Sequence, residues 1–182
     1  MRYSAFVIAF LIFFSSIVKA QLSPPSADKI LKEAYEDAAK ENKNVFVTFH
    51  ASWCVWCHKM DSSMNDKACK KFFADNFIIL HLTVDESKDK KNLENPGADD
   101  LRKKYHGEGQ GIPFWLILDK DSNLLADSKM RVEGAAADLG DNIGCPASEK
   151  EVDYFLKLLQ QTSKINAQEL DAIRKRFRQN EH

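Results

Sequence analysis

The chain has 182 residues, enough for one domain, because domains commonly contain about 100–200 residues. Its composition is 44% hydrophobic and 29% charged, which excludes a mainly disordered chain, a collagen-like chain and a protein with several membrane spans. The 26 Lys and Arg residues nearly balance the 27 Asp and Glu residues. The net charge of −1 therefore indicates no whole-chain attraction to nucleic acid or anionic lipid, and we expect neither as a partner.

Residues 1–20 have the pattern of a secretory signal peptide. Arg2 gives a positive start, residues 6–14 are apolar throughout, and residues 18–20 offer small side chains where a signal peptidase cleaves. The alternative is an uncleaved membrane anchor, but the apolar run of residues 6–18 is shorter than the roughly 20 residues that span a bilayer. We expect an exported domain over residues 21–182, first in a periplasm and otherwise secreted, where disulfides persist.

The first part of this domain predicts helices that alternate with two strands. Ser26 is a suitable N-cap, and apolar residues at helical spacing predict a helix from residue 27 to about 41. Residues 45–49 are β-branched and aromatic, which is typical of a strand, and a short turn and a helix follow. We expect Asn65 to cap another helix to about residue 74, before a largely buried strand over residues 77–84.

The next part is less regular. Residues 85–110 contain a charged stretch, a predicted short helix at 98–105 and a glycine-rich end, which together indicate an inserted, mobile connection. Residues 112–118 predict a strand that opens with a proline, and residues 124–126 return as its antiparallel neighbour. Residues 128–146 are interpreted as a loop.

Two capping boxes predict the last two helices. Ser148 with Glu151, and Asn166 with Glu169, have the spacing at which each side chain satisfies the other's backbone N–H. The first of these helices has an apolar stripe that is expected to cover the sheet. The second forms a C-terminal extension over about residues 166–180.

Cys54 and Cys57 are spaced as Cys-x-x-Cys at the expected start of a helix. Unpaired backbone N–H groups and the positive end of the helix dipole favour a thiolate on the first cysteine. A thiolate is the nucleophile of disulfide exchange, and the second cysteine can attack the mixed disulfide and release the product. We therefore expect Cys54 to attack and Cys57 to resolve, with Trp53 and Trp56 as an apolar rim for a peptide or partner protein.

The segment from Phe46 to Cys57, followed downstream by Gly111-Ile112-Pro113, resembles the thioredoxin family. It looks most like the thioredoxin-like C-terminal domain of membrane thiol:disulfide interchange proteins and related exported proteins. The resemblance implies an α/β fold over about residues 27–162, with a central mixed sheet flanked by helices. It also implies a cis Ile112–Pro113 bond against the cysteine pair, where both residues help bind substrate.

The same resemblance implies the chemistry of the partners. The substrates would be protein thiols and disulfides, the Cys54–Cys57 pair would cycle between dithiol and disulfide, and another redox protein would supply electrons. No dissociable cofactor and no metal is required. Ile112 before Pro113 resembles the reducing members of the family, which favours reduction or isomerisation. We expect a monomer that meets a membrane only if residues 1–20 are left uncleaved.

Three departures from thioredoxin lie in or near the motif, and one of them is Val55-Trp56 in place of Gly-Pro between the cysteines. Thr48 stands where thioredoxin has a buried aspartate that assists proton transfer at the second cysteine, and His50 replaces a family tryptophan. His50 or His58 is a candidate for that proton transfer, because imidazole titrates near neutral pH. The alternative is a histidine that is solvated or bonded to the backbone.

Three other functions are compatible with part of this pattern. Cys54 to His58 also has the Cys-x-x-Cys-His pattern of c-type haem attachment, but the preceding strand and the Ile112–Pro113 strand have no role in a small helical cytochrome. A structural zinc site would need a second ligand pair, and Cys69 and Cys145 stand alone. A binding module that keeps the fold without using its thiols is the third alternative.

Cys69 and Cys145 are interpreted as buried packing residues. The alternatives are a structural disulfide between them and exchange of one of them with the active pair.

Overall fold

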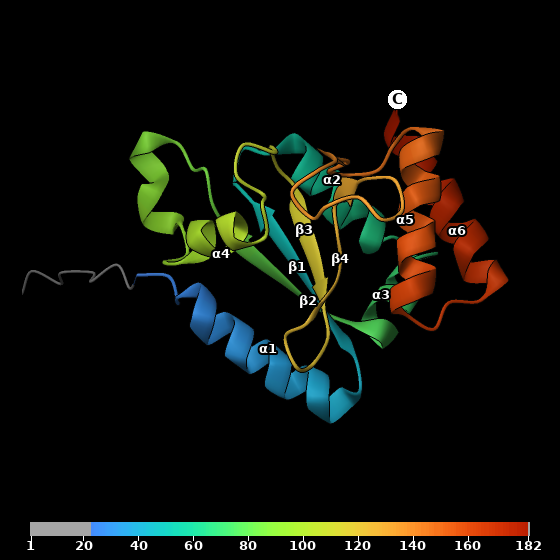
Figure 1. Cartoon of the computed structure of the whole chain (residues 1–182), viewed down its shortest axis with the longest axis horizontal. Helices are drawn as coiled ribbons and strands as arrows, with labels where there is room; N and C mark the ends of the chain where they lie inside the picture. Colours follow the sequence, from blue (N-terminus) through green and yellow to red (C-terminus); the bar gives the residue numbers. More distant parts are fainter. Residues whose placement is uncertain (1–22, 182) are drawn as a thin grey trace, which may run out of the picture.

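The computed structural model describes residues 23–181 (Figure 1). The expected signal peptide of residues 1–20 lies outside this range. Within it, no helix combines the length and the hydrophobicity that crossing a membrane requires.

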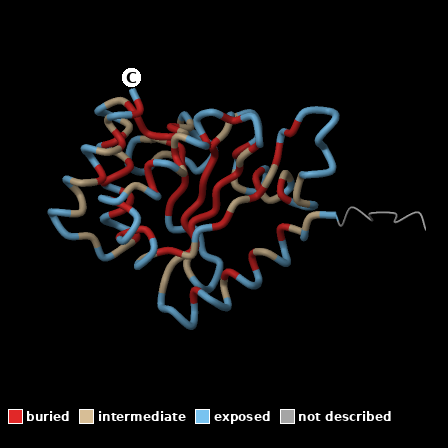
Figure 2. Tube along the Cα trace, turned by 180° about the vertical axis from the view of Figure 1, so that it is seen from behind, coloured by how far each residue is buried: buried red, intermediate tan, exposed pale blue. Residues whose placement is uncertain are grey.

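A four-stranded mixed sheet forms the centre of the fold, in the strand order β2-β1-β3-β4. The strands are β1 (Asn44–His50), β2 (Phe77–Thr83), β3 (Phe114–Leu118) and β4 (Leu124–Asp127). β1 pairs in parallel with β2 and antiparallel with β3, which pairs antiparallel with β4. All four strands were predicted from the sequence, and Figure 2 shows buried residues running along the central ones.

Helices cover both faces of the sheet (Figure 1). They are α1 (Ala27–Glu41), α2 (Val55–Met64), α3 (Lys70–Asn76), α4 (Ala98–Lys104), α5 (Glu149–Thr162) and α6 (Ala167–Arg178), with short 3-10 helices η1 (Lys88–Leu93) and η2 (Gln179–Glu181). α1 and the start of α4 pack against one face, and α2, α3, α5 and α6 against the other. The predicted fold class, with its extra C-terminal helix, is confirmed.

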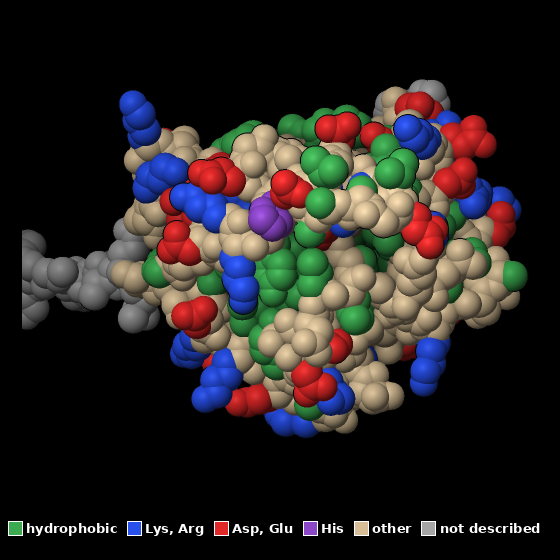
Figure 3. All heavy atoms as spheres, viewed as in Figure 1, with side chains coloured by type: hydrophobic (Ala, Val, Ile, Leu, Met, Phe, Trp, Pro, Cys, Tyr) green, Lys and Arg blue, Asp and Glu red, His purple; other side chains and the backbone are tan. Residues whose placement is uncertain are grey.

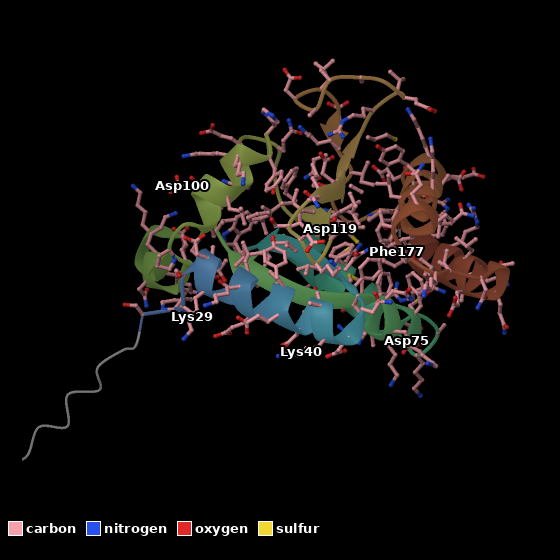
Figure 4. The ribbon with its side chains drawn as sticks, turned by 60° about the horizontal axis from the view of Figure 1, so that its bottom comes forward. Lys29, Lys40, Asp75, Asp100, Asp119 and Phe177 are labelled. Carbon is pink, nitrogen blue, oxygen red and sulfur yellow. A yellow bond between two sulfur atoms is a disulfide. The ribbon has the colours of Figure 1, made fainter. Side chains whose placement is uncertain are left out.

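The helix ends show why these segments are helical. The Ser26 hydroxyl accepts the N–H of Lys29 at the start of α1, and both predicted capping boxes are formed at α5 and α6. Each helix then buries one side. In Figure 4, Lys29 and Lys40 lie on the outer side of α1, whereas Phe177 on α6 lies inward, 5.1 Å from the ring of Phe155.

The predicted helix start at Asn65 is wrong. Asn65 instead ends α2, because its side-chain amide donates to the carbonyl of Asp61 at 2.9 Å, and its backbone N–H bonds to the same oxygen. α3 begins at Lys70, with Cys69 at its N-cap. An asparagine can cap either end of a helix, and the sequence does not reveal which.

Two strand predictions need smaller corrections. β3 begins at Phe114 rather than at residue 112, because Pro113 has no N–H to donate to the sheet. β2 is an edge strand and only half buried, with Ile79 exposed.

The two segments that were read as irregular contain ordered structure. The predicted loop of residues 128–146 includes the two-stranded sheet of β5 (Lys129–Met130) and β6 (Asp141–Asn142). Strands of two residues carry no readable alternation, so the sequence could not indicate them. Residues 85–110 contain η1 as well as the predicted helix α4, and Arg102 of α4 forms ion pairs with Asp85 and Asp99.

Candidate functional site

Cys54 and Cys57 form a disulfide at the N-terminus of α2. Cys54 is the N-cap of this helix, with an extended backbone, and its sulfur lies 3.1 Å from the backbone nitrogen of Cys57. β1 ends at His50, and a turn closed by the bond from Cys54 N–H to the Ala51 carbonyl leads into the helix. The sulfur therefore lies at the positive end of the helix dipole, where a thiolate is stabilised when the disulfide is reduced.

Ile112 and Pro113 lie against the cysteine pair. The peptide bond between them is cis, as the resemblance implied. The carbonyl oxygen of Ile112 is 3.6 Å from Cys54 Sγ, and the Ile112 side chain packs against Ala51 and both cysteines. The fold thus brings two motifs together that are more than fifty positions apart in the sequence.

Trp53 and Trp56 are exposed beside Cys54. Trp53 is 56% exposed and Trp56 is 45% exposed, with Val55 at 66% between them. The indole N–H of Trp53 donates to the Asp85 carbonyl at 2.8 Å, and Lys59 Nζ lies 4.4 Å from the centre of the Trp56 ring. In Figure 3, hydrophobic side chains line the upper edge of the molecule, where α2 lies in Figure 1. Exposed aromatic groups at one place are typical of interaction surfaces.

A groove of about 260 Å³ borders the site. One wall is the loop from Gln110 to Pro113, the other is residues 142–147, and Trp56 lies at its edge. Asn142 joins the walls, because its side-chain amide donates to the carbonyls of Gln110, Gly111 and Pro113 at 3.0–3.2 Å. No sequence pattern indicates this residue, since it lies in the predicted loop of residues 128–146.

Among residues 23–181, the side chains of Thr48, His50 and His58 form no hydrogen bond with the sulfur of either cysteine. Thr48 is 1% exposed, and its hydroxyl has no hydrogen-bond partner among the described residues. His58 Nε2 lies 3.1 Å from the Ser52 carbonyl, which matches the backbone-bonded alternative. His50 lies beside Thr83 and His81, and burial, reinforced by the nearby His81, lowers the pKa of His50 below its ordinary value.

Glu86 is a buried carboxyl group that sequence reasoning missed. It is 4% exposed, and its two oxygens accept the backbone N–H of Ser52 at 2.6 Å and the Ser52 hydroxyl at 2.9 Å. Burial acts to raise the pKa of Glu86, but the hydrogen bonds from Ser52, helped by Lys90 and His50, outweigh it and hold the pKa below its usual value. The only signal was an acid three residues after the end of β2, in a stretch rich in charged residues.

Cys69 and Cys145 are free and buried, and no disulfide joins them. Burial raises the pKa of Cys69 to about 11 and that of Cys145 to about 12. Cys145 accepts a hydrogen bond from the Asn180 amide at 3.3 Å, and Cys69 lies 3.9 Å from the Ala172 carbonyl. Both cysteines therefore have the environment of packing residues.

The chain belongs to the thioredoxin-like family, whose model matches residues 27–120. It is 33% identical over 63 residues to the uncharacterised protein B0495.5 of Caenorhabditis elegans, a stretch that covers 34% of this chain and 9% of that protein. The chain therefore spans less than a tenth of the length of this curated relative.

Two solved structures are also similar. A disulphide isomerase from Xylella fastidiosa Temecula1 is 22% identical, with a TM-score of 0.45 over 56% of this chain and 72% of that chain. The C-terminal domain of Neisseria meningitidis DsbD in its oxidised form is 19% identical, with a TM-score of 0.43 over 76% of this chain and 97% of that domain.

Proposed function

We propose that this protein is a thiol:disulfide oxidoreductase that reduces or isomerises protein disulfides through Cys54 and Cys57. The observation that carries the proposal is the Cys54–Cys57 disulfide at the N-terminus of α2, with the Ile112 carbonyl 3.6 Å from Cys54 Sγ. Membership of the thioredoxin-like family supports the same chemistry.

In the reducing direction, the Cys54 thiolate attacks one sulfur of a substrate disulfide. A Cys54–substrate disulfide forms, the substrate disulfide breaks, and one substrate sulfur leaves as a thiolate. Cys57, as a thiolate, then attacks Cys54 Sγ, forms the Cys54–Cys57 disulfide and releases the second substrate sulfur. Two electrons pass from the protein to the substrate, whose two thiolates take up protons from water. A dithiol protein must then return two electrons and two protons to the pair.

The proposed substrate-binding residues are Trp53, Trp56, Ile112 and Pro113. The two exposed indoles offer apolar contact area at the edge of the site. Ile112 packs against both cysteines, and Ile112, Pro113 and Trp56 line the same groove, so a polypeptide in this groove would meet the indole and the Ile112–Pro113 loop together.

The proposed setting is an exported one, periplasmic first and otherwise secreted, with residues 1–20 removed and residues 21–182 active as a monomer. Mass spectrometry of the protein recovered from a secreting host tests this directly. A mature chain that begins near residue 21 supports export, whereas an intact N-terminus in the membrane fraction supports the uncleaved anchor.

Turnover with insulin, whose disulfides are reduced to a visible precipitate, tests the chemistry. Cys54→Ser is expected to abolish reduction, and Cys57→Ser to accumulate mixed disulfides, because only the resolving attack is lost. Cys69→Ser and Cys145→Ser are the matched controls and should retain most of the activity. If the Cys54→Ser and Cys57→Ser variants both keep wild-type turnover, the proposed chemistry is wrong.

Pro113→Ala tests the binding role separately from the chemistry. We expect longer-lived mixed disulfides, because the loop that faces the sulfurs is disturbed while both cysteines are retained. Unchanged trapping and unchanged turnover would remove Pro113 from the site. A wild-type pair that never reacts with glutathione would instead favour the binding-module alternative.

A further inference from the structure

The two residues directly before Cys54 are both held by the segment that follows β2. Ser52 donates two hydrogen bonds to the Glu86 carboxylate, and the Trp53 indole donates to the Asp85 carbonyl. Asp85 is itself held by two hydrogen bonds from Arg102, at 2.5 and 3.1 Å. The turn that presents the nucleophile therefore rests on a charged segment outside the cysteine motif.

The group nearest this turn is an anion. Glu86 is 4% exposed, and its carboxylate is stabilised by the N–H and hydroxyl of Ser52 rather than by a cation. Among residues 23–181 it forms no ion pair; Lys90 and His50 act on it only at longer range, and its own N–H donates to Glu94. A hydrogen-bonded carboxylate without a paired cation keeps a full negative charge at neutral pH.

This charge is hydrogen-bonded to the turn that leads into Cys54. Ser52 is two residues before Cys54, so their Cα atoms are at most about 7 Å apart. The oxidised pair is neutral, whereas reduction creates a thiolate at Cys54. A fixed negative charge bonded to Ser52 opposes the thiolate by repulsion but not the disulfide, which is neutral. Salt screens this repulsion only partly, because Glu86 is buried.

We propose that Glu86 is a positioning residue for Cys54, whose fixed negative charge shifts the equilibrium of the Cys54–Cys57 pair from dithiol toward disulfide. The pair therefore gives up its two electrons more readily, which favours reduction of substrates over their oxidation. This inference rests on the proposed function and adds to it the origin of the redox direction.

Glu86→Gln is the decisive substitution, because it removes the charge and can retain both contacts. The amide oxygen can accept the Ser52 N–H, and the amide NH₂ can donate to a Ser52 hydroxyl that has turned round. The measurement is the equilibrium with glutathione at pH 7, in which two glutathione thiols reduce the disulfide and become glutathione disulfide. We expect the equilibrium constant for reduction to rise about three- to tenfold, where tenfold corresponds to 29.6 mV.

Three variants separate the charge from the hydrogen bonds. Ser52→Ala removes one hydrogen bond but keeps the anion, and Glu94→Gln removes a carboxylate of the same segment that does not contact the Cys54 turn. Both should stay within about twofold of the wild-type equilibrium constant. Lys90→Glu, an exposed change near Glu86, should lower the constant by about twofold, opposite to Glu86→Gln.

The outcomes are distinct. A folded Glu86→Gln variant with the wild-type equilibrium constant overturns the proposal, even if its melting temperature falls, because that pattern shows a structural role alone. If this variant does not fold, an unchanged constant in Lys90→Glu overturns the proposal. A wild-type Cys54–Cys57 pair that does not titrate with glutathione contradicts the proposed function itself, which the Glu86 variants do not address.

Discussion

The two halves of the site are held by different kinds of contact. The Cys54 turn rests on the charged residues Asp85, Glu86 and Arg102, whereas the loop of Ile112 and Pro113 is held by neutral amide bonds from Asn142. A charged support can alter the stability of a thiolate as well as its position. A neutral amide fixes geometry without adding a net charge, so the second support should affect substrate docking more than redox equilibrium.

The substitution with the largest expected effect is Asn142→Asp, which replaces the amide that holds the loop of Ile112 and Pro113. The asparagine amide donates to three carbonyl oxygens, and a carboxylate at the same place would face them with no donor. We expect kcat/KM for insulin reduction to fall at least about tenfold, since a buried polar group left unpaired costs about 1–3 kcal/mol. In the neutral variant Asn142→Ala, the glutathione equilibrium should move much less than it does in Glu86→Gln.

Asn142→Ala separates lost bonds from added repulsion and should have a smaller effect than Asn142→Asp. Asn92→Asp, an exposed change in η1, is the control for added charge and should behave as wild type. If Asn142→Asp keeps the wild-type kcat/KM, the loop of residues 110–113 holds its position without the hydrogen bonds from Asn142.

Arg102→Met tests the ion pair that holds Asp85, whose carbonyl accepts the indole N–H of Trp53. Arg102 is 6% exposed and pairs with Asp85 and Asp99, so its loss leaves both acids without this partner. We expect the free energy of unfolding to fall by about 2 kcal/mol, within the range for hydrogen bonds to charged groups.

Lys103→Met is the matched control in urea unfolding, because Lys103 pairs with Asp99 from a side chain that is 44% exposed. Exposed ion pairs contribute about 0–1 kcal/mol, so this variant should stay close to wild type. Equal losses in the two variants would mean that burial of Arg102 adds nothing to the support.

The smallest expected effect is the pH dependence of stability that His50 adds at the end of β1, directly before the Cys54 turn. Burial and the neighbouring His81 lower the pKa of His50 in the folded protein, so the unfolded chain binds the proton more tightly. The stability contribution is therefore complete above the unfolded pKa of about 6.5 and is lost as the pH falls through the lower folded value.

Urea unfolding at pH 7.5 and pH 5.5 measures this effect. His50→Asn should lose less stability than wild type between the two values, whereas His106→Asn, at a left-handed position that asparagine tolerates, should lose as much as wild type. If His50→Asn loses as much stability as the wild-type protein between pH 7.5 and pH 5.5, His50 is not the source of the pH dependence.

Local patterns were sufficient for most elements of the fold. The Ser26 cap, the capping box at Ser148 and the alternation of aromatic and β-branched residues in β1 depend on neighbours a few positions away. The error at Asn65 has the same origin, because an asparagine side chain can accept a hydrogen bond at the start of a helix or donate one at its end. In the folded chain the Asn65 amide donates to the Asp61 carbonyl of α2, so Asn65 ends that helix.

Contacts across the chain were not predictable in this way. Glu86 and Asn142 each lie more than twenty positions from the residues they hold, in segments whose composition resembles any exposed loop. β5 and β6 are too short to produce a pattern, and Ser128, directly before β5, donates its N–H to the Trp115 carbonyl of β3 and accepts the N–H of Ile143.

The sequence by itself determined most of the helices, the four strands of the central sheet, the cysteine motif at a helix start and, through the family resemblance, the pairing of that motif with Ile112–Pro113. These follow from backbone propensities, capping and a motif with fixed spacing, all of which act locally. Only the tertiary structure decided that a buried Glu86 carboxylate underlies the turn before Cys54 and that Asn142 closes the groove beside Pro113. Both depend on desolvation and on hydrogen bonds between distant segments, which exist only when the chain is folded.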